Sequence, residues 1–247
     1  MTRIPLVALL AVALAATVPA RARTITVPDA SFELNGAVET LACTEGLLDL
    51  PESIAVVPWS CSGDVVVTRL NACMTPQLPS DGSYAACLST GSLFGGIARG
   101  DVSSSLVSPP IDLGLRPDQI TVSFDLVYGT EEGLQSAVLN DTLSVTLLTG
   151  AGPFPLVAAD TWGMQPKGGN LKVTGGTPLG TPNLGCPVLY ETGRITVVST
   201  RSIPPSAADA VRNLPIFLQF DIRDLGDTSR TTFVCVDHIQ VKASPVN

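Results

Sequence analysis

Two adjacent carboxylates follow a strongly patterned segment, SFDLVYGTEEG, and they are the first candidates for chemistry in this sequence. Glu131 and Glu132 lie in a short loop that closes at Asn140 and Asp141, just before the next apolar run. Retaining glycosidases need two carboxyl groups about 5–5.5 Å apart and inverting ones about 6.5–9.5 Å apart, and Glu132 with Asp141 could reach either spacing. The same oxygens suit a cation. The third alternative is a set of carboxylates that only face solvent or order the loop.

A second acidic candidate lies in the last apolar run, TTFVCVDHIQVK. In a regular strand, side chains alternate between the two faces, so Asp237 shares a face with four apolar residues: Phe233, Cys235, Ile239 and Val241. Its neighbour His238 then points to the opposite face. A buried carboxylate without a partner is very costly. We therefore expect Asp237 to meet a cation, backbone donors or water at the end of the sheet.

The segment VPDASFEL, near the start of the chain, supplies Asp29 and Glu33. First and last strands often pair in closed sandwiches, so these acids could converge with Asp237. Calcium takes about six to eight oxygen ligands, mixing carboxylates with backbone carbonyls. A structural calcium ion joining the two ends of the chain is thus expected, and a surface turn without an ion is the alternative.

Sugar binding often uses aromatic platforms, and aromatic residues make up only 5% of this chain. Trp59 and Trp162 lie in loop-like segments and are the candidate ligand-binding residues. The alternative for each is core packing, especially for Trp59 beside Cys61.

Other catalytic machinery is poorly represented. His238 is the only histidine, and Asp237 beside it in a strand cannot orient it. No Gly-x-Ser-x-Gly elbow surrounds a serine, and no glycine-rich stretch continues into Gly-Lys-Ser/Thr. We therefore predict that the protein is not an enzyme.

The first 22 residues have the form of a secretory signal peptide. Arg3 precedes an apolar run from Pro5 to Val18, and small residues follow at cleavage positions. This run is shorter than the roughly 20 residues of a membrane-spanning helix. We expect a secreted or extracellular protein with one domain over residues 23–247 and no membrane insertion.

An exported chain with an even number of cysteines points to disulfides. The six are Cys43, Cys61, Cys73, Cys87, Cys186 and Cys235. The prediction is two local bridges, Cys43–Cys61 and Cys73–Cys87, and one long bridge, Cys186–Cys235.

The charge excludes one class of partner. The formal net charge is −8 and no basic cluster is present, whereas nucleic-acid binding depends on Lys and Arg neutralising phosphates. Docking on anionic lipid is disfavoured for the same reason.

Short β-branched runs separated by glycine and proline indicate an all-β fold. Several runs alternate apolar and polar residues, which is typical of antiparallel sheets. A short helix with Ser206 as its N-cap is expected within residues 204–215. The predicted strands are 24–27, 31–34, 53–57, 64–69, 84–89, 119–128, 141–148, 171–174, 194–199, 216–223 and 232–242.

The opening VPDASFE and the final VDHIQV resemble secreted jelly-roll carbohydrate-binding modules of the galactose-binding-like type. That resemblance implies a structural calcium ion held by Glu33 and Asp237. The segments LPSDGSYAACLSTG, SSSLVSPPIDL, ITVSFDLVYGTEEG and NDTLSVTLL resemble bacterial choice-of-anchor surface domains. The chain lacks their sorting tail and carries extra cysteines, so anchoring to the cell does not follow.

These observations combine into one expectation. The chain folds as an antiparallel jelly-roll β-sandwich with one short connecting helix, and it is a non-catalytic, calcium-stabilised module that binds a glycan or another component of the extracellular surface. Self-assembly into a homo-oligomeric surface layer or filament is the alternative function. A glycoside-active enzyme ranks third.

Overall fold

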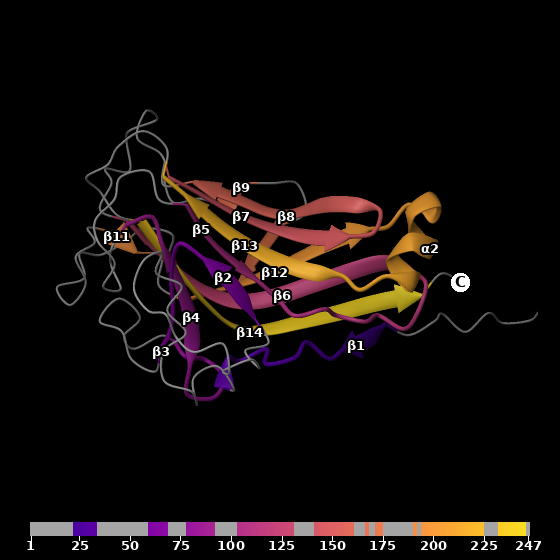
Figure 1. Ribbon diagram of the computed structural model, residues 1–247, viewed down its shortest axis with the longest axis horizontal. Coiled ribbons are helices and arrows are strands. Elements are labelled where there is room, and N and C mark those ends of the chain that lie inside the picture. The colour runs from indigo at the N-terminus through magenta and orange to yellow at the C-terminus, as the bar shows by residue number, and fades with distance from the viewer. Residues whose placement is uncertain are drawn as a thin grey trace, which may run out of the picture.

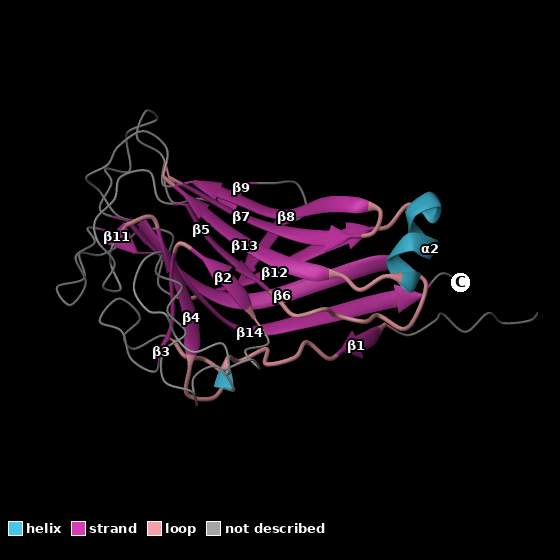
Figure 2. Ribbon diagram, in the orientation of Figure 1, coloured by secondary structure: helices cyan, strands magenta, loops and turns pink. Residues whose placement is uncertain are grey.

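The computed structural model describes residues 22–33, 59–68, 78–91, 103–130, 141–160, 166–167, 171–174, 190–191, 194–224 and 232–245. Strands dominate these ranges (Figure 2) and form two antiparallel sheets stacked face to face (Figure 1). The predicted antiparallel sandwich is confirmed. No helix within these ranges combines the length and the hydrophobicity that a bilayer span requires.

Sheet A has eight strands. Its main path is β10 (Leu171–Thr174), β12 (Ile195–Ser202), β6 (Pro117–Thr130), β14 (Thr232–Pro245), β4 (Ala85–Ser89) and β3 (Asp64–Thr68). Two short strands lie off this path: β1 (Arg23–Ile25) pairs with the end of β14, and β11 (Tyr190–Glu191) pairs with the end of β6. β1 and β4 thus lie one after the other along the same edge of β14.

Sheet B has six strands, in the order β2 (Ser60–Ser62), β5 (Ser103–Val107), β13 (Phe217–Arg223), β7 (Thr142–Thr149), β8 (Gly152–Asp160) and β9 (Pro166–Lys167). The chain passes repeatedly between the sheets, from β4 to β5 to β6 to β7 and from β12 to β13 to β14. These crossings bring the alternating apolar faces of both sheets together.

The main core lies between the sheets and has a chain of aromatic rings at its centre. Trp59, only 2% exposed, has its ring centroid 5.0 Å from that of Phe32 and 6.4 Å from that of Phe220. Phe124 meets Phe220 edge-to-face at 5.2 Å. Rings in these geometries stabilise a core beyond the area that they bury.

The helix α2 (Pro205–Asn213) lies at one end of the sandwich, at the same end as β1 and the C-terminal end of β14 (Figure 1). It buries Ala207, Ala208 and Val211 against the sheets. The predicted N-cap was wrong: the cap residue is Pro204, and the helix begins with Pro205. The fixed φ of proline suits the first helical turn, where its missing N–H costs nothing.

The predicted strand over residues 31–34 was also wrong where the structure describes it. Asp29 and Phe32 have φ of 48° and 59°, and the Phe32 amide donates to the Asp29 carbonyl. These left-handed residues form a compact turn that carries Glu33 beside the loop before β4.

Candidate functional site

The acidic residues of the two chain ends converge on one short loop. Glu33 Oε1 accepts hydrogen bonds from the backbone N–H of Ser83 at 2.5 Å and of Tyr84 at 2.9 Å. Asp237 Oδ2 accepts from the N–H groups of Ser80 at 2.6 Å and Asp81 at 2.8 Å. We call Asp29–Glu33, Leu78–Tyr84 and Asp237 together the terminal corner.

One further bond joins the terminal corner to the last strand, and another lies within the corner. The Ile239 amide donates to the Ala30 carbonyl at 3.1 Å, and the Ser31 hydroxyl donates to Asp81 Oδ2 at 2.7 Å. Backbone donors, one of the three partners considered for Asp237, therefore hold one of its oxygens.

The other oxygen of Asp237 is different. The side chain is fully buried, and Oδ1 has no hydrogen-bond partner. Burial raises the pKa of this carboxyl above its ordinary value, while the amides of Asp81, His238 and Ser80 and the Ser80 hydroxyl oppose that rise. The His238 amide contributes to this lowering of the Asp237 pKa but makes no hydrogen bond to Oδ1. A buried, electron-rich oxygen without a donor is suited to a cation.

Gly82 allows the loop to approach Glu33. Its φ is +75°, and a Cβ at this position would overlap Glu33 Oε1 and lie 2.6 Å from its Cδ. Gly114 also has a left-handed φ, +60°, but a Cβ there would meet nothing closer than an Arg23 nitrogen at 3.9 Å. The two glycines share the same backbone requirement and differ in crowding.

This difference gives a testable prediction. Gly114→Ala should lower the free energy of unfolding by about 1–2 kcal/mol, the cost of a left-handed non-glycine residue. Gly82→Ala should lower it by about 1–3 kcal/mol more, because the added methyl displaces the Glu33 carboxylate and breaks its hydrogen bonds to Ser83 and Tyr84. Urea unfolding of both variants measures the two losses, and equal losses would contradict the role given to Glu33.

A β-bulge in β14 separates the terminal corner from the rest of the strand. The pairing with β6 shifts between Asp237 and Gln240, so that β14 has two residues, His238 and Ile239, opposite one on β6. His238 has φ of 53°. For a residue other than glycine this conformation costs about 1–2 kcal/mol.

The bulge reverses which residues of β14 face the core. Phe233 and Cys235 belong to a small apolar cluster on the outer face of sheet A, whereas Ile239 and Val241 belong to the main core. The prediction that all four share a face with Asp237 was therefore wrong. A bulge inserts one extra residue into a strand, so the alternation of side chains is inverted beyond it.

The bulge also places His238 beside a carboxylate that the sequence did not suggest. Asp125 of β6 is directly opposite Asp237, and its Oδ2 lies 3.7 Å from His238 Nδ1. Thr196 of β12 donates to Asp125 Oδ1 at 2.5 Å. Gln240 Nε2 lies 2.6 Å from His238 Nε2. With the amide nitrogen of Gln240 placed as the donor, the matching neutral tautomer of His238 carries its proton on Nδ1, the ring nitrogen that faces Asp125.

Two further polar rungs follow along the same face. Ser123 is paired with Val198 on one side and Gln240 on the other. Thr121 is paired with Thr200 and Lys242, and the two threonine hydroxyls lie 3.0 Å apart. We call these residues, with Asp125, Thr196 and His238, the open half of sheet A. Most of them are half-buried, and Lys242 is exposed.

Asp141 lies directly before β7, near the end of β4 and the start of β14. It is fully buried, and its Oδ2 accepts from the Thr90 hydroxyl at 2.9 Å. Thr90 in turn exchanges hydrogen bonds with the backbone of Thr232. Asp141 therefore ties the end of β4 to the start of β14. Glu131, Glu132 and Asn140, the other members of the predicted cation loop, lie outside the described residues.

Trp59 is not a ligand platform. Its ring is buried in the main core, and its Nε1 donates to the Asp29 carbonyl at 3.1 Å. It therefore stabilises the turn that leads to Glu33. Trp162, the second candidate platform, lies outside the described residues.

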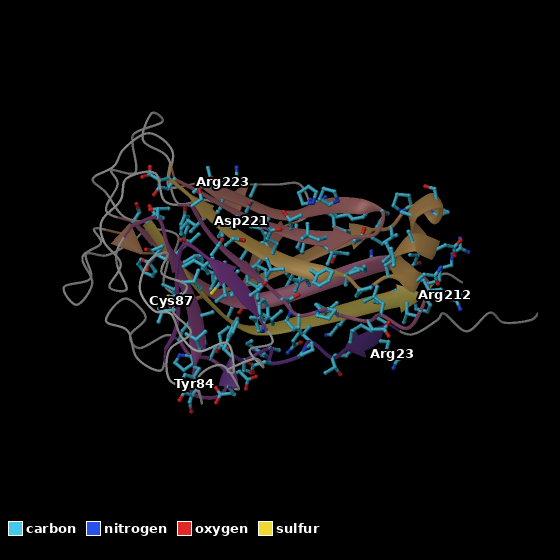
Figure 3. All side chains as sticks on the ribbon, viewed as in Figure 1. Arg23, Tyr84, Cys87, Arg212, Asp221 and Arg223 are labelled. Atoms are coloured by element: carbon cyan, nitrogen blue, oxygen red, sulfur yellow. A yellow bond between two sulfur atoms is a disulfide. The ribbon has the colours of Figure 1, made fainter. Side chains whose placement is uncertain are left out.

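One disulfide replaces two of the predicted bridges. Cys87 of β4 is bonded to Cys235 of β14, at directly paired positions (Figure 3). The predicted bridges from Cys73 to Cys87 and from Cys186 to Cys235 were therefore wrong. Cys61 is also disulfide-bonded. Since Cys43, Cys73 and Cys186 lie outside the described residues, the Cys43–Cys61 bridge stays a prediction, as does the signal peptide.

Comparisons with known proteins give distant structural likenesses only. No family model matches the chain, and no curated protein matches it. The module TmCBM61, solved in complex with β-1,4-galactotriose, superposes with a TM-score of 0.41 at 13% identity, over 90% of this chain and 99% of that one. The K1 cleaved adhesin domain of Lys-gingipain from Porphyromonas gingivalis W83 gives 0.39 at 10% identity, over 76% and 92%. The C-terminal family 22 carbohydrate-binding module of Clostridium thermocellum Xyn10B gives 0.30 at 11% identity, over 78% and 89%.

Proposed function

We propose that this chain is a non-catalytic extracellular module that binds glycan through the open half of sheet A and is stabilised by calcium at the terminal corner. The observation that carries the proposal is the polar composition of that face. Three adjacent strands, β12, β6 and β14, present hydroxyl, amide and imidazole groups on three successive rungs. These groups supply both donors and acceptors of hydrogen bonds, which match the hydroxyl groups of a sugar.

The roles of the described carboxylates support a binding function over a catalytic one. Glu33 and Asp237 hold backbone amides of one loop, and Asp141 holds the Thr90 hydroxyl. Asp125 faces an imidazole and accepts from Thr196. Each of these acids positions part of the fold. The disulfide between Cys87 and Cys235 supports an oxidising, extracellular location.

The structural calcium ion of this proposal would lie at the terminal corner. Asp237 Oδ1 would be a ligand, because it is buried without a donor. The oxygen of Glu33 that does not bind Ser83 and Tyr84 would be a second. The ion would supply the positive charge that offsets the burial of Asp237, which backbone amides alone do not provide.

Affinity gel electrophoresis tests glycan binding. The chain from Arg23 onward is run, in millimolar calcium, through gels that contain xylan, β-1,4-galactan, glucomannan or barley β-glucan, with polygalacturonate as an anionic comparator. We expect retardation in at least one neutral gel. Migration unchanged in every gel would overturn the proposed function, and concentration-dependent oligomers would then favour a self-assembling subunit.

A further inference from the structure

We infer that His238 and Gln240 are the ligand-contacting centre of the open half of sheet A, that Asp125 and Thr196 are their positioning residues, and that the ligand is a neutral saccharide. This inference rests on the proposed function and assigns it to particular side chains.

The backbone of His238 is the first observation. It is a left-handed residue inside a strand, a conformation that only glycine adopts without steric cost and in which few other residues occur. The bulge at this position turns the imidazole onto the outer face of sheet A, where 43% of the side chain is exposed. Strained residues that a fold retains are concentrated at functional sites.

The second observation is that the exposed imidazole is already oriented. The Asp125 side chain is only 9% exposed, and the Thr196 hydroxyl fixes one of its oxygens. The other oxygen faces Nδ1 of the ring, and the Gln240 amide binds the second ring nitrogen. A side chain ordered before binding loses less conformational entropy when a ligand arrives. Solvated residues on an ordinary outer face do not have such support.

The chemistry around the imidazole indicates the class of ligand. The neighbouring rungs carry the hydroxyls of Ser123, Thr121 and Thr200, which can both donate and accept. The charge of Asp125 is directed at His238, and the exposed Lys242 lies at the far rung. Three rungs span about 13 Å along the strands, which accommodates a short oligosaccharide. This arrangement matches uncharged hydroxyl groups better than a row of carboxylates or sulfates.

Sheet B provides a matched control. Gln219 of β13 is also a half-buried amide on an outer face, and its Nε2 donates to Asp221 Oδ1 at 2.8 Å. Its strand has no register shift in its pairing with β5 or β7. Gln219 thus offers the same amide chemistry on the outer face of sheet B, without a bulge or a left-handed residue in its own strand.

The experiment compares His238→Gly, Gln240→Thr and the control Gln219→Thr by gel retardation and thermal unfolding, using the polysaccharide that retards the wild type. His238→Gly removes the ring and relieves the backbone, so its melting temperature should equal or exceed that of the wild type. Its affinity should fall by roughly 2–12-fold, as for one lost hydrogen bond. Gln240→Thr should show a similar loss, and Gln219→Thr should bind like the wild type.

Because His238 is the only histidine, its imidazole signals in a ¹⁵N spectrum need no assignment. We expect them to shift when the saccharide is added. In the free protein, Asp125→Asn should change the tautomer that these signals report, without lowering the melting temperature to the same extent as a core substitution.

The outcomes separate the two claims. If the wild type binds glycan but His238→Gly and Gln240→Thr bind equally well, the inference is overturned and the proposed function stands. A lower melting temperature of His238→Gly with unchanged affinity would show a purely structural ring. Stronger retardation in polygalacturonate than in every neutral gel would overturn the ligand class. If the wild type binds no glycan, both claims fail.

Discussion

Removing the Cys87–Cys235 bridge should lower the free energy of unfolding by about 3–5 kcal/mol. The bridge joins residues 148 positions apart in the sequence. For a loop of this length, the entropy that the cross-link removes from the unfolded chain corresponds to about 5 kcal/mol of stabilisation. The bridge at Cys61 already constrains the unfolded chain, so the loss should be somewhat smaller than that limit. Urea unfolding of the double variant Cys87→Ala/Cys235→Ala measures it.

A second double variant separates the cross-link from packing. Both sulfurs lie in the small buried cluster with Phe233 and Val127. Cys87→Val/Cys235→Val refills that volume with apolar groups but also lacks the covalent bond. It should recover part of the loss seen with alanine and remain less stable than the wild type. Wild-type stability in the valine pair would show that the bridge contributes nothing beyond its volume.

Asp237→Asn should abolish stabilisation by calcium. The wild type should gain about 2.7–4 kcal/mol of unfolding free energy when calcium is present at about 100–1,000 times its dissociation constant. In chelator the free energy of unfolding of Asp237→Asn should equal or exceed that of the wild type, because the variant has no carboxylate charge to bury. The cost of burying that charge is what raises the pKa of the Asp237 carboxyl in the wild type. In calcium the order should reverse, because the neutral amide binds the ion poorly. Thermal unfolding with calcium and then with chelator measures both arms.

The matched control is Asp112→Asn. Asp112 is exposed and accepts from the Gly114 amide within its own turn. The same chemical change there should leave the calcium-dependent shift intact. A wild type that shows no shift, or an Asp237→Asn variant that keeps one, would remove calcium from the proposed function.

The sequence predicts much of the sandwich because the face that each sheet turns to the main core is apolar. The alternation in β6, β7 and β13 places the core side of each strand correctly. The same reasoning fails in β14, where the faces invert at His238. A bulge leaves little trace in the local pattern, since His238 and Ile239 are as compatible with a regular strand as with an inserted residue. Only the pairing with β6 reveals it.

The terminal corner could be predicted in part. The convergence of Glu33 and Asp237 follows from pairing of the first and last strands, and the structure brings both to one loop. The loop itself, Ser80–Tyr84, was not anticipated, because its contribution is backbone amides rather than distinctive side chains. Gly82 was the only signal in the sequence, and many of the 22 glycines give the same signal.

The errors at Trp59 and at the cysteines have a common cause. Both predictions relied on neighbours in sequence: a loop around the tryptophan and the nearest available thiols. In the fold, Trp59 packs on Phe220, and β4 lies beside β14. Contacts between distant segments decide both outcomes, and a single sequence does not contain them.

The pairing of β1 with the end of β14 has a mechanical consequence. Arg23 is opposite Ala243, so force applied through the two ends of the described chain loads this ladder from its open end. Antiparallel pairs loaded in this way separate one after another, in contrast to a sheared ladder whose bonds resist together. Once the three β1–β14 pairs have separated, the load falls on the bond between Ala30 and Ile239 of the last strand and on the bonds between Glu33 and the loop before β4. Calcium bound at the terminal corner would then hold the first and last segments together. Its concentration would set the force at which the first segment separates from β14.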